Sequence, residues 1–514
     1  MFRGLRNLGR LFGIARTLAR HDALGALGGA QVSRPLRLAM RLIVLRKLSG
    51  ITERRPGERL SLALQALGPA FIKLGQVLSV RVDLIGEEMA EDLSLLQDRL
   101  PPFAGSEAIA TIEAAFDRPV AEIFETFDPE PVAAASIAQV HRAVTPDGVV
   151  TAVKILRPGV EDAFRRDLDL FRWLAGLVER NLPSLKRLKP VEVVETLADS
   201  AAVELDLRLE AAAADELRRN FEDDPNFIVP AVDWSRTAGR VLTTEWIDGV
   251  QLHDRRALER EGHDLEAVVA NLARAFFLQI FRDGFFHADL HPGNLFIAED
   301  GAVIAVDFGI MGRVDRKTRQ YLAEMLLGFL TGDYQRVAEA HFRAGYVPAG
   351  QSKEAFAQAA RSIAEPILGL PLNQISLARL LSQLFQVTER FQMETQPQLL
   401  LLQKTMLVAE GVGRGLYPVV NLWELARPLI ADWMAETLGP EARIRDAVGD
   451  IVRGLERLPA LLGDLEDSVD SMARDGLRLH PDTVRAVAAR RKRWPIWAGA
   501  GAAVAAALYA ALAG

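Results

Sequence analysis

The chain contains no cysteine, and this absence removes several kinds of chemistry at once. Disulfides, cysteine nucleophiles and thiolate metal sites are all excluded, although the redox compartment stays undecided. A net charge of −7 gives the 514-residue chain no overall polyanion-binding character, so we expect no nucleic-acid partner. The 49% apolar and 25% charged residues are typical of a globular protein that buries one large core or a few smaller ones.

Lysine is scarce as well, since it supplies nine of the 61 basic residues. This arginine bias suggests a GC-rich bacterial genome. Where arginine would serve equally well the chain mostly uses arginine, so a retained lysine indicates a site that needs a compact ammonium on a flexible stem. Lys73 and Lys154, both discussed below, are two of the nine.

Acidic residues are nearly missing from the first 52 positions, which hold ten Arg or Lys and one acid, Asp22. Apolar side chains recur at helical spacing there, and the neighbouring arginines lie outside that stripe. The favoured interpretation is an interfacial helix on an anionic membrane, and the alternative is a helix packed on the body with a solvated basic face. The stripe consists of Phe2, Leu5, Leu8, Leu11, Phe12 and Ala15, and the arginines are Arg3, Arg6, Arg10 and Arg16.

Charge is absent again from the last 21 residues, 494–514, which would span roughly 31 Å as a helix. Four basic residues, Arg490 to Arg493, come directly before it. This pattern predicts a C-terminal transmembrane helix in the bacterial inner membrane, with the catalytic body facing the cytoplasm. The segment is mostly Ala and Gly, so a buried or surface-lying apolar helix is the alternative. Such small residues also suit helix–helix contact, and hence a homodimer.

Periodicity between the two ends predicts a mixture of helices and strands. Alternation at Val149, Thr151, Val153 and Ile155, after the turn 145–148, indicates a β-hairpin. The other predicted elements are helices at 56–128 and at 160–222, the latter broken near Pro183 and Pro190, a buried strand at 241–247, a helix at 265–283, a short strand at 303–306, and helices with proline breaks from 318 to about 490.

Two ordered motifs carry the chemistry. Residues 287–294 read H-x-D-x-x-x-x-N, and D-F-G begins thirteen residues after the asparagine. Phosphoryl transfer needs metal-held phosphates and a charge clamp. We expect Asp307 to bind Mg²⁺, Asn294 to hold the same or a second Mg²⁺, and Asp289 to take a proton from a hydroxyl or orient a water. Gly309 would let the chain turn sharply. An isolated D-F-G would indicate a β-turn, but the full constellation favours catalysis.

Lys154 lies in the strand T-A-V-K-I, which matches the V-A-I-K pattern of kinases and would place its ammonium on the α- and β-phosphates of ATP. Such a lysine needs a carboxylate partner on a helix. Asp206 and Glu210 are spaced i, i+4 and would share one helical face. A solvated helix with a Glu204–Arg208 pair is an equally good interpretation of this stretch.

Several features of protein kinases are missing. No G-x-G-x-x-G precedes Lys154, and its place is taken by Ala133, Ala134, Ala135 and Ser136, whose alanines restrict close backbone approach to phosphates. No A-P-E motif follows, and a helical run begins soon after 312. These absences argue against a conventional peptide-binding groove. We expect adenine to lie against the segment 244–247, at the end of the strand predicted at 241–247, on backbone groups of Glu245 and Ile247.

A further motif, K-x-G-Q at Lys73, Gly75 and Gln76, completes the set. With E-x-D at Glu204 and Asp206, the alanine-rich loop, H-x-D-x-x-x-x-N and D-F-G, residues 55–430 resemble the UbiB family, the atypical kinase-like proteins of ubiquinone biosynthesis. The resemblance implies an α+β, bilobal protein-kinase-like fold. It further implies that the K-x-G-Q helix covers the active site and is regulatory together with Glu204 and Asp206. Lys73 would approach these two acids and act in catalysis as well, and Glu210 would be the partner of Lys154.

The resemblance also implies ATP and Mg²⁺ as cofactors and ATPase rather than protein kinase activity, coupled to polyprenyl quinone precursors at an anionic membrane beside other quinone-biosynthesis enzymes. A small-molecule or lipid kinase, or a nucleotide-binding scaffold, is the alternative. Some family members carry the label of hydroxylase, but this sequence contains no flavin fingerprint and no iron triad. Gly411-x-Gly413-x-Gly415 lies in a helical context, so we do not interpret it as a nucleotide-binding motif. The expected domains are 1–54 basic membrane-proximal helices, 55–128 K-x-G-Q extension, 129–250 N-lobe with inserted helices, 251–430 helical C-lobe, 431–493 linker and 494–514 transmembrane helix.

Overall fold

The computed structural model describes residues 2–23, 54–79, 85–94, 100–181, 190–366 and 397–419, and short pieces at 387–388, 390–393, 425, 428–431 and 433–434. The chain divides into two compact units, Met1–Met434 and Ala435–Gly514. Among the described residues, no helix combines the length and the apolarity needed to cross a bilayer. The predicted transmembrane segment 494–514 and almost all of the predicted linker 431–493 lie outside the described residues.

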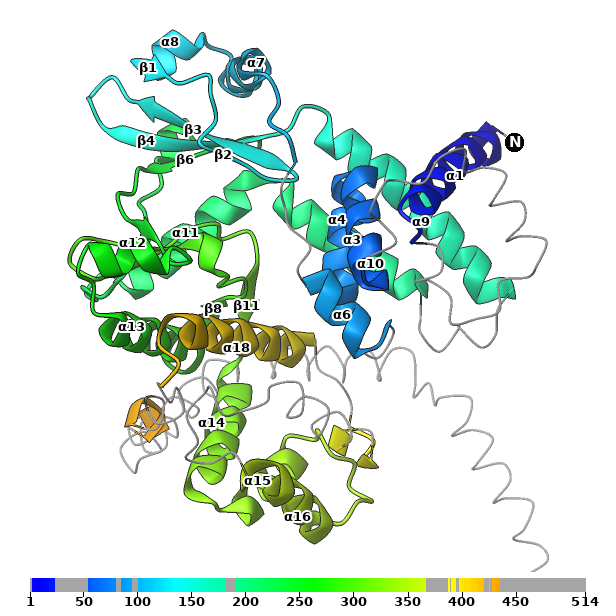
Figure 1. The fold of residues 1–514 in the computed structure, drawn as a ribbon, viewed down its shortest axis with the longest axis vertical. Coiled ribbons are helices and arrows are strands. Elements are labelled where there is room, and N and C mark those ends of the chain that lie inside the picture. The colour runs from blue at the N-terminus through cyan, green and yellow to red at the C-terminus, as the bar shows by residue number, and fades with distance from the viewer. Residues whose placement is uncertain are drawn as a thin grey trace, which may run out of the picture. The chain divides into compact units, whose positions relative to one another are not determined.

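Helices form most of the described residues in the ranges 2–94 and 160–204, as their periodicity predicts (Figure 1). Phe71, Phe164, Phe171 and Leu197 lie in one apolar core that these helices share, and the rings of Phe71 and Phe171 meet edge to face at 4.9 Å. Burial of such large side chains is the main source of stability for this packing. The helices are α1 (Phe2–Arg20), α3 (Pro56–Leu67), α4 (Pro69–Ser79), α6 (Glu87–Ser94), α9 (Val160–Asn181) and α10 (Pro190–Glu204).

Helix α1 has two different faces. Ile14 and Leu18 are buried in the shared core, and Arg10 binds both carboxylate oxygens of Asp167 on α9 at 2.9 Å. Phe12, in the apolar stripe predicted to face a membrane, is 55% exposed. One face of α1 therefore packs on the body, as the alternative interpretation had it. Arg10 is not merely solvated, and membrane contact by the opposite face stays a prediction.

A five-stranded antiparallel sheet, with β1 to β4 before α9 in the chain and β6 after α10, has the order β1-β3-β4-β6 with β2 paired to β3. The predicted hairpin is confirmed: Val144 lies opposite Val150, and Gly148 in the turn adopts a φ of +85°, which glycine tolerates without strain. Helices α7 and α8 pack on one face of this sheet through an apolar cluster. The elements are α7 (Gly105–Phe116), α8 (Val120–Ile123), β1 (Thr126–Phe127), β2 (Ala133–Ala134), β3 (Ala138–Val144), β4 (Val150–Leu156) and β6 (Val241–Glu245).

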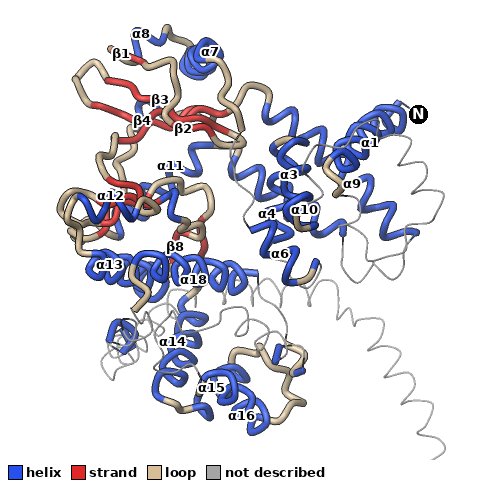
Figure 2. Tube along the Cα trace, viewed as in Figure 1, coloured by secondary structure: helices blue, strands red, loops and turns tan. Residues whose placement is uncertain are grey.

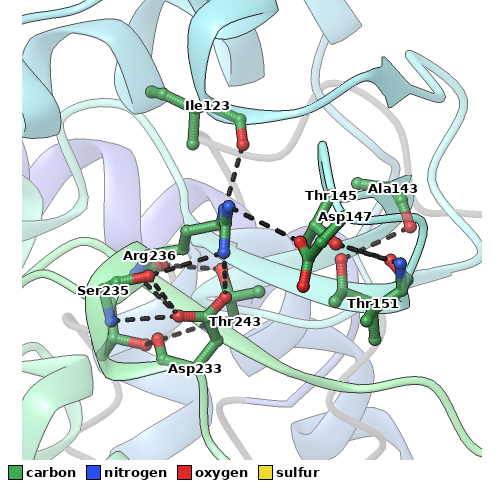
Figure 3. Close-up of polar contacts among 11 residues, drawn as sticks. Ile123, Ala143, Thr145, Asp147, Thr151, Asp233, Ser235, Arg236 and Thr243 are labelled. Carbon is green, nitrogen blue, oxygen red and sulfur yellow. Dashed lines mark hydrogen bonds and ion pairs between the residues drawn. The ribbon is translucent and has the colours of Figure 1, made fainter.

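Arg236 joins three parts of this region (Figure 3). It lies in the short 3-10 helix η3 (Trp234–Arg236), where its Nε donates to the carbonyl of Ile123 at 3.0 Å and its Nη1 to Asp233 at 2.5 Å. Its Nη2 lies 4.0 Å from Asp147 in the hairpin turn. The sheet edge, helix α8 and the hairpin tip are thereby held together by one guanidinium with several donors in fixed geometry.

The predicted helix across residues 204–210 is interrupted. Helix α10 ends at Glu204, and Asp206 adopts extended backbone angles as the N-cap of α11 (Leu207–Asn220), accepting a hydrogen bond from the backbone N–H of Arg208. Aspartate is among the strongest N-capping residues, because its carboxylate satisfies N–H groups that the helix leaves unpaired. The prediction that Asp206 and Glu210 share one helical face is therefore wrong.

Two small sheets, of order β5-β10-β9-β7 and β11-β8, lie beside helices α12 and α13, and all their strands except β5 come after β6 in the chain. The predicted helix at 265–283 is confirmed, although its last turn is a π-helix that ends at Gly284. The elements are β5 (Phe227–Ile228), β7 (Val250–Gln251), α12 (Arg255–Arg260), α13 (Leu265–Leu278), β8 (Phe285–His287), β9 (Leu295–Ile297), β10 (Val303–Ala305) and β11 (Met311–Arg313).

Helices return after residue 315, as predicted (Figure 2). Three of them share an apolar cluster that includes Val337 and Phe356. A fourth contacts α13 and strand β11, and thus lies against the region that carries the sequence motifs. They are α14 (Arg316–Thr331), α15 (Tyr334–Arg343), α16 (Lys353–Ala364) and α18 (Pro397–Leu416).

Candidate functional site

Lys154 is the centre of the site. The alternation of β4 places it on the face of the sheet opposite to α7 and α8, because Val153 and Ile155 lie in the cluster with those helices. Its Nζ donates to both carboxylate oxygens of Glu210 at 2.7 and 2.9 Å, and to Oδ1 of Asp307 at 2.8 Å. The structure thus brings together three residues that the sequence separates by up to 153 positions.

The two acids that bind Lys154 have pKa values shifted in opposite directions. Burial raises the pKa of Glu210, although Lys154 opposes the rise. Burial also acts to raise the pKa of Asp307, but the charge and hydrogen bond of Lys154 outweigh it and hold that pKa at about 2. The Asp307 side chain is 47% exposed whereas that of Glu210 is 7% exposed. Asp307 is therefore an ionised carboxylate that a ligand can reach.

Hydrogen bonds fix the loop that carries Asp289 and Asn294. Buried His287 accepts the backbone N–H of Asp289 at Nδ1 (3.1 Å) and donates from Nε2 to the carbonyl of Val306 (3.1 Å). The N–H of Val306 returns to the carbonyl of Asn294 (2.9 Å), and the Asn294 amide nitrogen donates to the carbonyl of Asp289 (3.1 Å). Burial lowers the pKa of His287, which keeps it neutral in this tautomer.

The backbone turn at D-F-G lies at a different residue from the one predicted. Asp307 adopts a φ of +64°, while Gly309 does not lie in the left-handed region. A non-glycine residue at positive φ costs free energy and occurs often at functional sites, where the surrounding structure maintains it. Gly309 lies close to three acids, because a Cβ there would be in ordinary van der Waals contact, 3.5 Å from Oδ1 of Asp307 and 4.0 Å from both Glu204 and Glu210.

Those distances place the K-x-G-Q helix next to the site. Lys73 and Gly75 lie in α4 and are buried, and the ammonium of Lys73 pairs with the carboxylate of Glu204. Gln76 is half-buried, and its carbonyl accepts from the Ser79 hydroxyl at 2.7 Å. Because Glu204 also borders Gly309, Lys73 lies one side chain away from D-F-G.

The second acid of the E-x-D motif has another task. Asp206 caps α11, and Arg208 donates to its two carboxylate oxygens at 2.9 and 2.6 Å. The predicted alternative of a Glu204–Arg208 pair is wrong, because Arg208 binds Asp206 and Glu204 binds Lys73.

The alanine-rich loop is a tight turn between strands. Ala133 and Ala134 form β2, paired to β3, and the N–H of Ala135 donates to the carbonyl of Ala138 at 2.8 Å. Ser136, at the tip, is buried. Arg157, which the sequence analysis did not single out, donates to the Ala135 carbonyl at 2.8 and 3.1 Å. The Arg157 side chain thus stabilises this turn, whereas glycines would give such a loop more conformational freedom.

The predicted adenine contacts are available only in part. The backbone N–H of Glu245 already donates to the carbonyl of Ala231 at 2.8 Å, so this N–H does not serve a base, whereas contact through the Glu245 carbonyl stays a prediction. Ile247 follows the end of β6, and within the described residues its N–H donates no hydrogen bond. Of the two N–H groups, Ile247 is thus the one left for a nucleotide.

The donor set fits a magnesium ion that is shared with phosphates. The described residues contain no group of three or more His, Asp or Glu side chains that would hold a metal by themselves. Asp307 supplies an accessible carboxylate, and Asn294 uses its amide nitrogen on Asp289, so its amide oxygen is the atom that would bind a metal. Mg²⁺ commonly takes one or two such ligands and completes its shell with phosphate oxygens and water.

Comparison with known proteins agrees with this geometry. Residues 95–341 match the family model of the ABC1 atypical kinase-like domain, and residues 360–421 match that of the UbiB helical domain. The fold is therefore kinase-like, of the atypical ABC1 class.

The relatives narrow this class. The chain is 42% identical over 476 residues to a Marinobacter nauticus protein named probable protein kinase UbiB, covering 92% of this chain and 87% of that protein. It is 44% identical over 420 residues to a protein of the same name from Azotobacter vinelandii, covering 81% and 78%. The chain belongs to the UbiB family. A solved complex of Rv3197 with erythromycin, from Mycobacterium tuberculosis, is 28% identical, with a TM-score of 0.48 over 74% of this chain and 94% of that one.

Proposed function

We propose that this protein is a Mg²⁺-dependent ATPase whose hydrolysis is coupled to the handling of polyprenyl-phenol intermediates in ubiquinone biosynthesis at an anionic membrane. The observation that carries the enzymatic part is the Lys154 ammonium held between buried Glu210 and accessible Asp307. The ubiquinone role follows from the family. Residue roles below are part of the proposal.

Each residue has a physical task in this proposal. Lys154 binds the α- and β-phosphates, and Glu210 fixes its position through two hydrogen bonds. Asp289 orients the attacking water, with its backbone held by His287 and Asn294. Asp307 and Asn294 would hold Mg²⁺, which supplies neutralisation of charge on the transferred phosphoryl group.

The K-x-G-Q helix limits access. Glu204 lies beside Gly309 and pairs with Lys73 of α4, and both side chains are nearly buried, so α4 borders the end of the site where D-F-G lies. We propose that this helix excludes peptides and slows basal hydrolysis until a lipid or partner moves it. Transfer to a small molecule or lipid is the alternative outcome of the same chemistry.

The test is ATP turnover of the intact protein and of Asp307→Asn, with Mg²⁺, with and without anionic liposomes and a 4-alkylphenol. We expect slow turnover by the wild type, stimulation by the liposomes, and a loss of about 100-fold or more in the variant. Equal turnover by both proteins would refute the assignment of Asp307. A radiolabelled phosphate on the alkylphenol would favour the kinase alternative.

A further inference from the structure

Helix α18 contacts the catalytic loop, residues 287–294, through a hydrogen bond. Thr405 is fully buried, and its hydroxyl lies 3.2 Å from the carbonyl of Ala288 and 2.9 Å from that of Leu401, one turn earlier in its own helix. Ala288 precedes Asp289, and its N–H donates to the carbonyl of Ile310 at 3.0 Å. A hydroxyl has one proton, so Thr405 shares it between its own helix and the loop.

The same face of α18 borders a groove. Val408, Val412 and Leu416 follow Thr405 at spacings of three, four and four residues, which places all four side chains on one side of the helix. These three apolar side chains line a groove of about 260 Å³ that is partly open to solvent. Its other wall includes Pro292 of the catalytic loop.

The floor of the groove is made of glycine. A Cβ added to Gly411 or Gly415 would meet nothing within 4 Å, so both face open space. This accounts for Gly411 and Gly415. Glycine allows a flat ring to approach the helix backbone closely.

One side of the groove is basic. His253 and Arg255 line it together with apolar Leu252. The guanidinium of Arg255 gives its Nε to Glu259 at 2.8 Å and its Nη1 to the carbonyl of Gly415 at 3.4 Å, and its side chain remains 47% exposed. Its further N–H groups suit an acidic head group.

We propose that this groove binds an amphiphile with a planar, acidic head and an apolar chain, and that α18 transmits its occupancy to Asp289 through the Thr405–Ala288 contact. The head lies over the glycine floor beside Arg255, and the chain follows Val412 and Leu416. Pro292 is adjacent to His291, whose Nε2 lies 3.8 Å from the Asp289 carboxylate, so the bound head is next to the catalytic loop. The coupling rests on the proposed ATPase, whereas the binding does not.

Binding is tested without nucleotide, by calorimetric titration of the full chain with 4-octylbenzoate and with neutral 4-octylbenzyl alcohol. Gly411→Leu and Gly415→Leu project into the groove, where a Cβ meets nothing within 4 Å, and they favour the helix; circular dichroism checks that both variants fold. Gly176→Leu on α9, where a Cβ meets Arg180 at 3.8 Å, is the matched control. We expect the groove variants to lose benzoate affinity at least tenfold and the control to keep it. No benzoate binding by the wild type, or unchanged affinity in both groove variants, overturns the site, and equal affinity for the alcohol overturns the acidic head.

The coupling is tested by ATP turnover with increasing 4-octylbenzoate. Thr405→Val keeps the shape of the side chain and removes its proton. We expect this variant to bind the benzoate normally and to keep its KM for ATP, while the response of kcat to the benzoate disappears and Thr405→Ser restores it. A response in Thr405→Val equal to that of the wild type overturns the coupling and leaves the binding result standing.

Discussion

Two lysine–glutamate ion pairs lie on either side of the bend between helices α10 and α11. They differ in their exposure to solvent, and this difference indicates a separate role for each pair. Lys154 binds Glu210, in the first turn of α11, and Lys73 binds Glu204, at the end of α10. Lys154 also binds Asp307, which is 47% exposed, whereas the side chains of Lys73 and Glu204 are 7% and 13% exposed. The Lys154 cluster therefore exposes a charged carboxylate that ligands can reach, whereas the Lys73–Glu204 pair is shielded from solvent.

A comparison of charge leads to different roles. Lys154 faces two carboxylates, and the accessible one is ionised, which suits a metal ion and phosphates. Lys73 and Glu204 are nearly buried, and such a pair contributes little net stability but is costly to break. We therefore expect variants of the first pair to affect chemistry first, and variants of the second to affect the fold around α4 first.

The largest effect is expected for Lys154→Met, measured as Mg²⁺-ATP turnover. Loss of the ammonium removes the phosphate contact and the group that positions Asp307, so turnover should fall about 100-fold or more. Lys353→Met, an exposed residue at the start of α16, is the matched control and should keep wild-type turnover. Comparable turnover in both variants would contradict the role given to Lys154.

Lys73→Met sharpens the other side of the comparison. It leaves the Glu204 carboxylate nearly buried without its ammonium, so the free energy of unfolding should fall by about 3 kcal/mol, measured by urea denaturation. Glu204→Gln added to Lys73→Met should recover part of that loss, because the uncompensated charge is gone. A double variant as unstable as the sum of the two single variants would show that the two side chains do not interact.

The pH dependence of stability separates the pairs further. Glu210 has a raised pKa in the folded protein, so the folded state binds a proton that the unfolded state has released. The stability contributed by this proton is present below the ordinary glutamate pKa of about 4.3 and declines as pH rises through the folded value. Glu210→Gln should lack this decline in unfolding measured from pH 4 to 8. An unchanged slope in Glu210→Gln would mean that another group titrates.

The smallest effect is expected at the residue between the two pairs. Asp206→Ala removes the N-cap of α11 and should cost about 1 kcal/mol of stability, while Asp206→Asn, which can still cap, should cost less. Thermal unfolding and ATP turnover are measured together. If Asp206→Asn lowered stability as much as Lys73→Met does, the sequence-based prediction that Asp206 serves Lys73 would be favoured over capping.

Local patterns in the sequence predicted much of the fold. The hairpin with its turn at 145–148, the strand at 303–306 and the helix at 265–283 follow from short-range periodicity, and the structure contains all three. The helix interruption at Asp206 was missed, because periodicity does not distinguish a capping aspartate from one on a helix face. The sharp turn of D-F-G was predicted at Gly309, but Asp307 adopts the left-handed conformation. Intrinsic backbone preference favours glycine for such a turn, and the packing around Asp307 outweighs that preference.

The sequence by itself determined which chemistry is available: Lys154, Asp289, Asn294 and Asp307 have the residue types and spacing of phosphate chemistry, and no cysteine competes. The tertiary structure decided which groups meet. The contacts of Lys154 with Asp307 and of Thr405 with Ala288 join positions 153 and 117 residues apart. No local preference encodes such contacts, because they depend on how buried faces of distant elements pack together.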